Sequence, residues 1–180
     1  WPRVAAERFD AARNMTERMG ALTALTESRS PLAEGALERM HALFRGDALV
    51  INKWFALQAT MPEQDGKVFA RVKQLLRHPD FSLRNPNRAR SLLSTFCHAN
   101  PSALHRADAA GVVFWADRVL ELDAINPQIA ARLARALDRW DRLAEPYRSA
   151  AREALARVAA RADLSSDVGE IVEHALQASA

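Results

Sequence analysis

RNPNRARSLLSTFCHANP, residues 84–101, carries the signals that decide the fold. The stretch opens and closes on Asn-Pro. Asparagine can accept a hydrogen bond from a first-turn amide, and the fixed φ of proline suits the first helical position. Four apolar residues in between recur at the spacing of one helix face: Ala89, Leu92, Leu93 and Phe96. The stretch predicts a helix over 86–97 capped by Asn85, and a new helical turn that starts at Asn100.

Similar start signals recur along the chain, and nearly every segment between them has helical spacing. They lie at Asn14, Ser30-Pro31, Asn126-Pro127, Pro146 and Ser165 or Ser166. The predicted helices cover residues 4–13, 15–27, 31–44, 47–62, 67–77, 86–97, 108–122, 127–143, 147–161 and 166–177. No segment has convincing strand spacing. Many short helices with short links predict an all-α fold of stacked antiparallel helix pairs.

Length and composition are those of one globular domain outside a membrane. The chain has 180 residues, of which 49% are hydrophobic, and no apolar run approaches the roughly 20 residues of a membrane-spanning helix. Its start at Trp1-Pro2 suggests a domain cut from a longer protein. Cys97 is the only cysteine, which rules out an internal disulfide and is compatible with a reducing compartment. We expect the cytoplasm.

The charge composition is basic but mixed. The formal net charge is +3 and the pI is about 9.6. Three of the 25 basic side chains are lysines: Lys53, Lys67 and Lys73. The 22 acidic residues are interspersed along the chain, whereas a nucleic-acid surface needs a cluster of one sign. We therefore expect no nucleic-acid partner.

Motifs for catalysis or metal binding are missing from the sequence. No two histidines stand at i and i+4, and HExxH does not occur, so we expect no zinc ligands in this chain. Cys97 has His98 beside it, but adjacent helical residues diverge, so a packed thiol is the better interpretation. Trp54, Trp115 and Trp140 are interpreted as core anchors. We expect no catalytic residue.

The arginines on the Asn-Pro helices have two interpretations. On helix 127–143, an inward stripe is predicted at Ile129, Leu133, Ala136 and Trp140. One flank of that stripe carries Gln128, Arg132, Arg135 and Arg139. Arg132 is closest to the apolar edge, so we expect it to be partly sheltered. A half-buried arginine beside a glutamine could hold a carboxylate, whereas solvent-facing arginines need no explanation. On helix 86–97, Arg88 and Arg90 lie on opposite flanks.

Four strings carry a resemblance to a known family. They are ALVINKWFALQAT (48–60), HPDFSLRNPNRARSLL (78–93), NPSALHRADAAGVVF (100–114) and NPQIAARL (126–133). In order and over nearly the whole chain, they resemble the C-terminal helical domain of the M1 family of zinc metallopeptidases, in its proteobacterial alanyl aminopeptidase branch. Residues 1–46 match more weakly, and no role is carried onto them.

The resemblance implies an armadillo- or HEAT-like superhelix spanning residues 1–180, as the C-terminal domain of a larger chain. The whole enzyme would remove N-terminal residues from peptides, using zinc held by HExxH and a distal glutamate. A Gly-x-Met-Glu-Asn loop would bind the free amine. Both motifs belong to another domain and are absent here. This domain would pack over that catalytic domain, close its cavity and restrict entry to small peptides.

The resemblance also assigns site residues. In this branch, the second arginine of the NPNRxR motif and the arginine five residues after the proline of NPQ point into the cavity, and these correspond to Arg90 and Arg132. Their implied role is to bind the C-terminal carboxylate or nearby carbonyls of a peptide. Gln128 matches the NPQ glutamine, implied to lie near the first-residue pocket. Two alternatives remain: a stand-alone helical scaffold that binds a protein or peptide, and an RNA-binding helical repeat.

Overall fold

The computed structural model describes residues 1–177, and every regular element among them is helical. The α-helices are α1 (Pro2–Ala11), α2 (Met15–Glu27), α3 (Ala33–Phe44), α4 (Ala48–Ala59), α5 (Lys67–Leu75), α6 (Pro86–Ala89), α7 (Thr95–Ala99), α8 (Pro101–Leu104), α9 (Ala110–Asp123), α10 (Pro127–Ala134), α11 (Tyr147–Ala159) and α12 (Ser166–Gln177). A π-helical segment, η1 (Arg90–Ser94), joins α6 to α7, and two 3-10 turns, η2 (Arg135–Leu137) and η3 (Trp140–Arg142), follow α10. Within residues 1–177, no helix combines the length and apolar character needed to cross a membrane.

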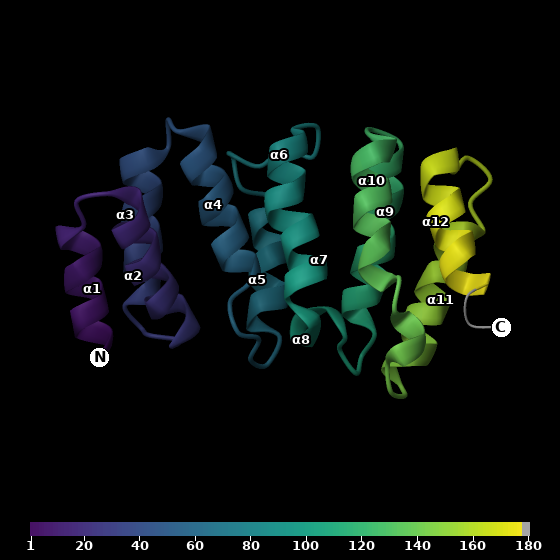
Figure 1. The fold of residues 1–180 in the computed structure, drawn as a ribbon, viewed down its shortest axis with the longest axis horizontal. Coiled ribbons are helices and arrows are strands. Elements are labelled where there is room, and N and C mark those ends of the chain that lie inside the picture. The colour runs from purple at the N-terminus through teal and green to yellow at the C-terminus, as the bar shows by residue number, and fades with distance from the viewer. Residues whose placement is uncertain (178–180) are drawn as a thin grey trace.

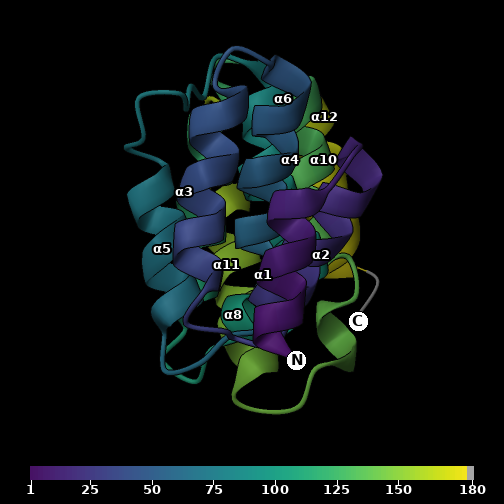
Figure 2. The same ribbon diagram turned by 90° about the vertical axis from the view of Figure 1, so that its left-hand side faces the viewer.

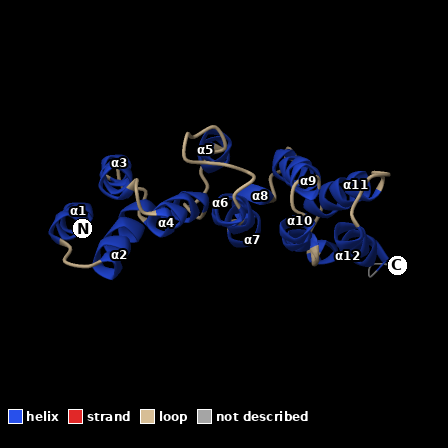
Figure 3. Cartoon of the chain, turned by 90° about the horizontal axis from the view of Figure 1, so that it is seen from above, coloured by secondary structure: helices blue, strands red, loops and turns tan. Residues whose placement is uncertain are grey.

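The helices stand side by side along the long axis, with α1 at one end and α12 at the other (Figure 1). Seen from above, they form two rows. One row contains α3, α5, α9 and α11, and the other contains α2, α4, α6–α7, α10 and α12 (Figure 3). The view along the stack shows the helix axes roughly aligned (Figure 2). Because α9 packs on α10 and α11 on α12, the predicted all-α stack of helix pairs is confirmed.

Three buried tryptophans tie the stack together. One hydrophobic core extends along the chain, from Phe9 to Ala175. Each indole N–H donates to a backbone carbonyl of another element at 2.9 Å: Trp54 to Leu37, Trp115 to Leu133, and Trp140 to Ala175. A buried indole needs such an acceptor, since its N–H would otherwise be left unpaired. The prediction that these residues are core anchors is confirmed.

Most of the predicted helix starts are confirmed by their capping hydrogen bonds. Side-chain oxygens accept first-turn amides at Asn14 (from Glu17), Asn85 (from Asn87 and Arg88), Asn126 (from Ile129) and Ser165 (from Val168). Each bond satisfies an amide that has no partner within its own helix. These caps set where the helices that carry the site begin.

Two predicted starts were wrong in detail. The side chain of Asn100 does not cap α8. It is buried, and its amide donates to the carbonyls of Ala59 and Met61 at 2.9 Å, so it holds the end of α4 instead. Pro31 lies in a turn rather than at the first helical position, because Ser30 accepts the amide of Leu32 and α3 begins only at Ala33.

Two predicted helices are less regular than their spacing suggested. Helix 86–97 passes through the π segment η1, where the hydroxyl of Thr95 donates to the carbonyl of Arg90, five residues earlier. Helix 127–143 ends at Ala134. Two carbonyls near that end accept side-chain donors from other helices, Leu133 from Trp115 and Arg132 from His98. These competing bonds accompany the tightening of the chain into η2.

Candidate peptide-binding site

The predicted site residues lie on two neighbouring segments of one row (Figure 3). Arg90 is the first residue of η1, while Gln128 and Arg132 belong to α10, which packs against η1. All three residues are exposed. The structure therefore brings the two arginine-bearing segments together and leaves both arginines open to solvent.

The prediction that Arg132 is partly sheltered was wrong, since the residue is exposed. That prediction assumed an unbroken helix to residue 143. Because α10 ends at Ala134, the chain turns and buries Leu137, while Ala136 on the predicted stripe is only partly buried. The apolar stripe that was expected to shelter Arg132 therefore does not continue past the end of α10.

Arg90 is held by its own helix. Its Nη2 donates to Oδ1 of Asn87 at 2.5 Å, one turn earlier. This bond restricts the long side chain while leaving the other guanidinium donors of Arg90 available. The π segment that begins at Arg90 is the kind of helix irregularity often found at functional sites.

The backbone of Arg132 is hydrogen-bonded to α7, the helix that follows the Arg90 segment. His98, on α7, donates Nε2–H to the carbonyl oxygen of Arg132 at 3.0 Å. The guanidinium of Arg132 has no ion pair within residues 1–177. His98 thus fixes the spacing of the two segments without occupying either arginine.

An open groove of about 620 Å³ is lined jointly by α4 and α6–α7, which pack against each other, and we call it the basic groove. It is lined by Asn52, Lys53, Ala56, Asn87, Arg90, Ser91, Ser94, Thr95, His98 and Ala99. Arg90 is therefore a groove residue, whereas Arg132 and Gln128 are not among its lining residues. Lys53 supplies a second cation, which the motif analysis did not single out.

Acidic residues are absent from the chain segments that build this face. Residues 48–62, 81–107 and 124–137 contain no aspartate or glutamate. Because the 22 acids look interspersed over the whole chain, this segregation was missed, although the three acid-free segments can be read directly from the sequence. The fold then sets α4, α6–α7 and α10 side by side in one row (Figure 3). The Lys and Arg side chains that these three segments contribute therefore have no acidic neighbour within the segments themselves.

Arg88, which was predicted to lie on the flank opposite Arg90, has a structural role. Its Nε donates to the carbonyl of Asp80 at 2.8 Å, and its Nη1 donates to the carbonyl of Ala48 at 3.2 Å and to Asn52 Oδ1 at 2.5 Å. Its guanidinium also lies over the ring of Phe55, 5.5 Å from the centroid. Arg88 joins α6 to α4 and is not free to bind a ligand.

His41, His78 and Asp80 form a cluster that sequence spacing did not predict. His41 Nε2 donates to Asp80 Oδ2 at 2.5 Å, and the Asp80 N–H donates to His78 Nδ1 at 3.1 Å. Burial, followed by the charge of His41, lowers the pKa of His78. The hydrogen bond from His41 lowers the pKa of Asp80. His41 lies 39 positions before Asp80, so no local motif could reveal the contact.

The cluster does not fit a zinc ion, although its ligand-type atoms all lie within 4.8 Å of one another. A histidine that binds zinc donates its second ring N–H to an acceptor. At His78, Nδ1 instead faces a donor, the Asp80 N–H. The Arg88 guanidinium also donates to the Asp80 carbonyl, which places a cation beside the cluster. We therefore assign the three residues to hydrogen bonding between α3 and the 76–85 connection.

Cys97 is a packed thiol, as predicted. The residue is buried in the core, and burial raises the pKa of its thiol. A thiol held in the neutral form is a poor nucleophile. Its neighbour His98 points instead to the carbonyl of Arg132, so the two residues do not act as a nucleophile and base.

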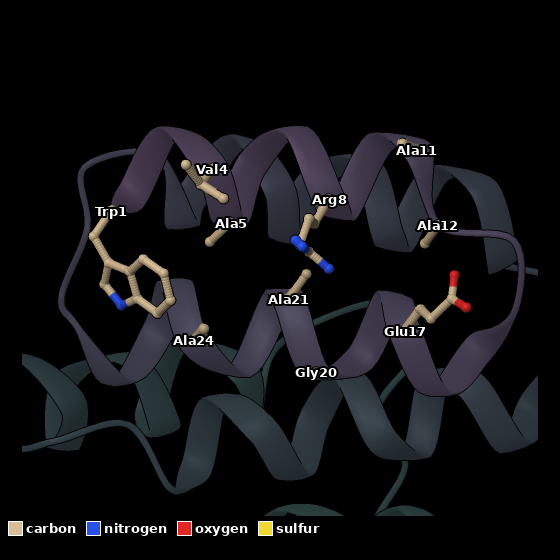
Figure 4. A pocket seen from close by; sticks show the side chains of 10 residues that line it. All are labelled: Trp1, Val4, Ala5, Arg8, Ala11, Ala12, Glu17, Gly20, Ala21 and Ala24. Carbon is tan, nitrogen blue, oxygen red and sulfur yellow. The ribbon is translucent and has the colours of Figure 1, made fainter.

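A second cavity lies at the N-terminal end, between α1 and α2, and measures about 550 Å³ (Figure 4). Trp1, which precedes α1, lies opposite Ala24 of α2, and Arg8 of α1 lies opposite Ala21 (Figure 4). The lining is mainly apolar, and Trp1 is 89% exposed. This cavity falls within residues 1–46, to which the sequence assigned no role.

The chain is similar in sequence to a family of known domains and to bacterial aminopeptidases. A family described as "Domain of unknown function (DUF3458_C) ARM repeats" matches residues 1–177. Aminopeptidase N of Caulobacter vibrioides is 42% identical over 168 residues, which is 93% of this chain and 19% of that protein. Aminopeptidase N of Escherichia coli is 35% identical over 170 residues, covering 94% and 19%.

A solved structure agrees with these relatives. Legionella pneumophila aminopeptidase A, in complex with aspartic acid, superposes with a TM-score of 0.89 at 33% identity, covering 98% of this chain and 21% of that one. The chain thus spans about a fifth of the length of the proteins it matches. The resemblance identified in the sequence is confirmed, and the chain belongs to the DUF3458_C family of ARM-repeat domains found in bacterial aminopeptidases.

Proposed function

We propose that residues 1–180 form the C-terminal domain of an aminopeptidase that removes N-terminal residues from small peptides. The 42% identity to an aminopeptidase N over 93% of this chain carries the proposal. The zinc ion implied by the resemblance would activate water in a part of the polypeptide outside this chain. The contribution of this domain is to position the substrate, and we place the enzyme in the cytoplasm.

The row that contains α4, α6–α7 and α10 is the surface proposed to face the substrate. Arg90 and Arg132 are exposed there, and neither has an ion pair within residues 1–177. Since the surrounding segments carry no acid, a bound carboxylate meets no like charge from them. Each guanidinium can offer two parallel N–H donors to a carboxylate.

In this account Arg90 and Arg132 bind the C-terminal carboxylate of the peptide. Gln128, one helical turn before Arg132 on the exposed start of α10, lies near the first residue of the substrate. Packing over the catalytic domain closes the cavity, so that only short peptides enter. Holding both ends of a peptide restricts its motion and lowers the entropic cost of reaching the reactive geometry.

Arg132→Ala in the complete polypeptide tests the proposal. The KM for di- and tripeptides should rise by about tenfold, because a charge-assisted hydrogen bond to the free carboxylate is lost. The KM for the corresponding peptide amides should hardly change. Arg152→Ala, an exposed arginine on α11 in the other row, is the matched control. Equal effects of Arg132→Ala on acids and amides would rule out the anchoring role.

A further inference from the structure

The basic groove presents cations from two different helices. Lys53 comes from α4 and Arg90 from η1, and both line the same volume of about 620 Å³. In the row, α6–α7 lies between α4 and α10 (Figure 3). The segment that carries Arg90 therefore has α4, which carries Lys53, on one side and α10, which carries Arg132, on the other. The groove is shallow and open to solvent, so a ligand there would meet the two cations at the protein surface.

No acidic side chain within residues 1–177 is paired with the two cations of the groove. Lys53 is exposed, and neither Lys53 nor Arg90 has an ion pair within residues 1–177. No lining residue is acidic. Ser94, which also lines the groove, has a buried hydroxyl oxygen without a hydrogen-bond partner in the described residues. Buried polar atoms in folded proteins are usually paired with protein or ordered water, so this oxygen is not counted as a contact of the groove's ligand.

We propose that Lys53 is a specificity residue that binds the side-chain carboxylate of an acidic residue at the C-terminal end of the peptide. This proposal rests on the proposed function, in which Arg90 and Arg132 hold the terminal carboxylate. An acidic side chain on the same residue then extends along the groove from Arg90 toward Lys53. Peptides ending in glutamate are thereby selected over those ending in glutamine.

The test compares Ala-Ala-Glu with Ala-Ala-Gln on the complete polypeptide. Both peptides keep the terminal carboxylate, so the ratio of their kcat/KM values isolates the side-chain charge. The unmodified enzyme should prefer the glutamate peptide by about fivefold, the effect of one partly exposed ion pair. Lys53→Met should bring the ratio close to one, and Lys53→Arg should keep it above one. Raising the ionic strength should shrink the preference, because exposed charges are screened.

Lys67→Met is the matched control, because Lys67 is also exposed but begins α5, in the other row. It should leave the ratio unchanged. A ratio near one in the unmodified enzyme, or a preference that survives Lys53→Met, would overturn the proposal. The proposed function has a separate readout, the acid-to-amide comparison in Arg132→Ala. Failure of the Lys53 role alone would leave that comparison intact.

Discussion

Arg88 and Arg90 show how two arginines separated by one residue acquire opposite roles. Positions two apart on a helix point about 200° apart, so the two side chains leave the helix on different sides. The guanidinium of Arg88 donates hydrogen bonds to Asp80, Ala48 and Asn52. Within residues 1–177, the Arg90 guanidinium hydrogen-bonds to Asn87 of its own helix. The two arginines were predicted only to lie on opposite flanks, and the acceptors of Arg88, two of them about 40 positions earlier, are contacts that spacing cannot identify.

This difference predicts opposite effects on stability. Arg88→Ala should lower the free energy of unfolding of the 180-residue chain by about 2 kcal/mol, because the carbonyls of Asp80 and Ala48 and the amide oxygen of Asn52 lose a charged donor. Arg88→Lys should not restore it, since an ammonium cannot reproduce the fork of donors. Arg90→Ala should change stability by no more than about 0.5 kcal/mol. Urea unfolding of the variants checks this, and equal losses for Arg88→Ala and Arg90→Ala would contradict it.

At the scale of elements, the connection between α5 and α6 is fastened by hydrogen bonds to neighbouring helices. His41 of α3 holds Asp80, and the Asp80 amide holds His78. Arg88 of α6 holds the Asp80 carbonyl. The Asp80 bond to His78 needs an unprotonated Nδ1, so the connection should loosen when His78 takes up a proton.

Acid should therefore weaken the fold through His78. Burial lowers its pKa in the folded state, so the unfolded chain binds the proton first as the pH falls through about 6.5. The stability contributed by His78 is complete above that pH and is lost below it. His78→Asn keeps an acceptor but cannot titrate, so it should lose less stability than the unmodified chain between pH 7.5 and 5. Urea midpoints at both pH values measure this, and identical losses would refute it.

The elements themselves were largely predictable, because caps and apolar spacing are local. Asn14, Asn85 and Asn126 cap as expected. Helix 127–143 was predicted too long because side chains from other helices, His98 and Trp115, bind its carbonyls. The buried amide of Asn100 likewise bonds to segments about 40 residues earlier. Contacts of this kind depend on the tertiary arrangement, which spacing within one helix does not contain.

For the whole molecule, stacking turns separate acid-free segments into one basic surface. The sequence alone placed Arg90, Arg132 and Gln128 through a family resemblance, and it placed Lys53 nowhere. Only the order of α4, α6–α7 and α10 within one row shows that the segments carrying these residues are neighbours (Figure 3). The proposal that this row anchors peptides rests on these neighbouring basic segments as well as on the family resemblance.

The most direct test of this account is a double-mutant cycle on Arg90 and Arg132 in the complete polypeptide. The measured quantity is the ratio of kcat/KM for a tripeptide to that for its amide. Each alanine substitution should lower the ratio by about tenfold. The double variant should lower it by less than the product of the two, because both guanidiniums hold the same carboxylate. A ratio that stays at the unmodified value in all three variants would contradict the account.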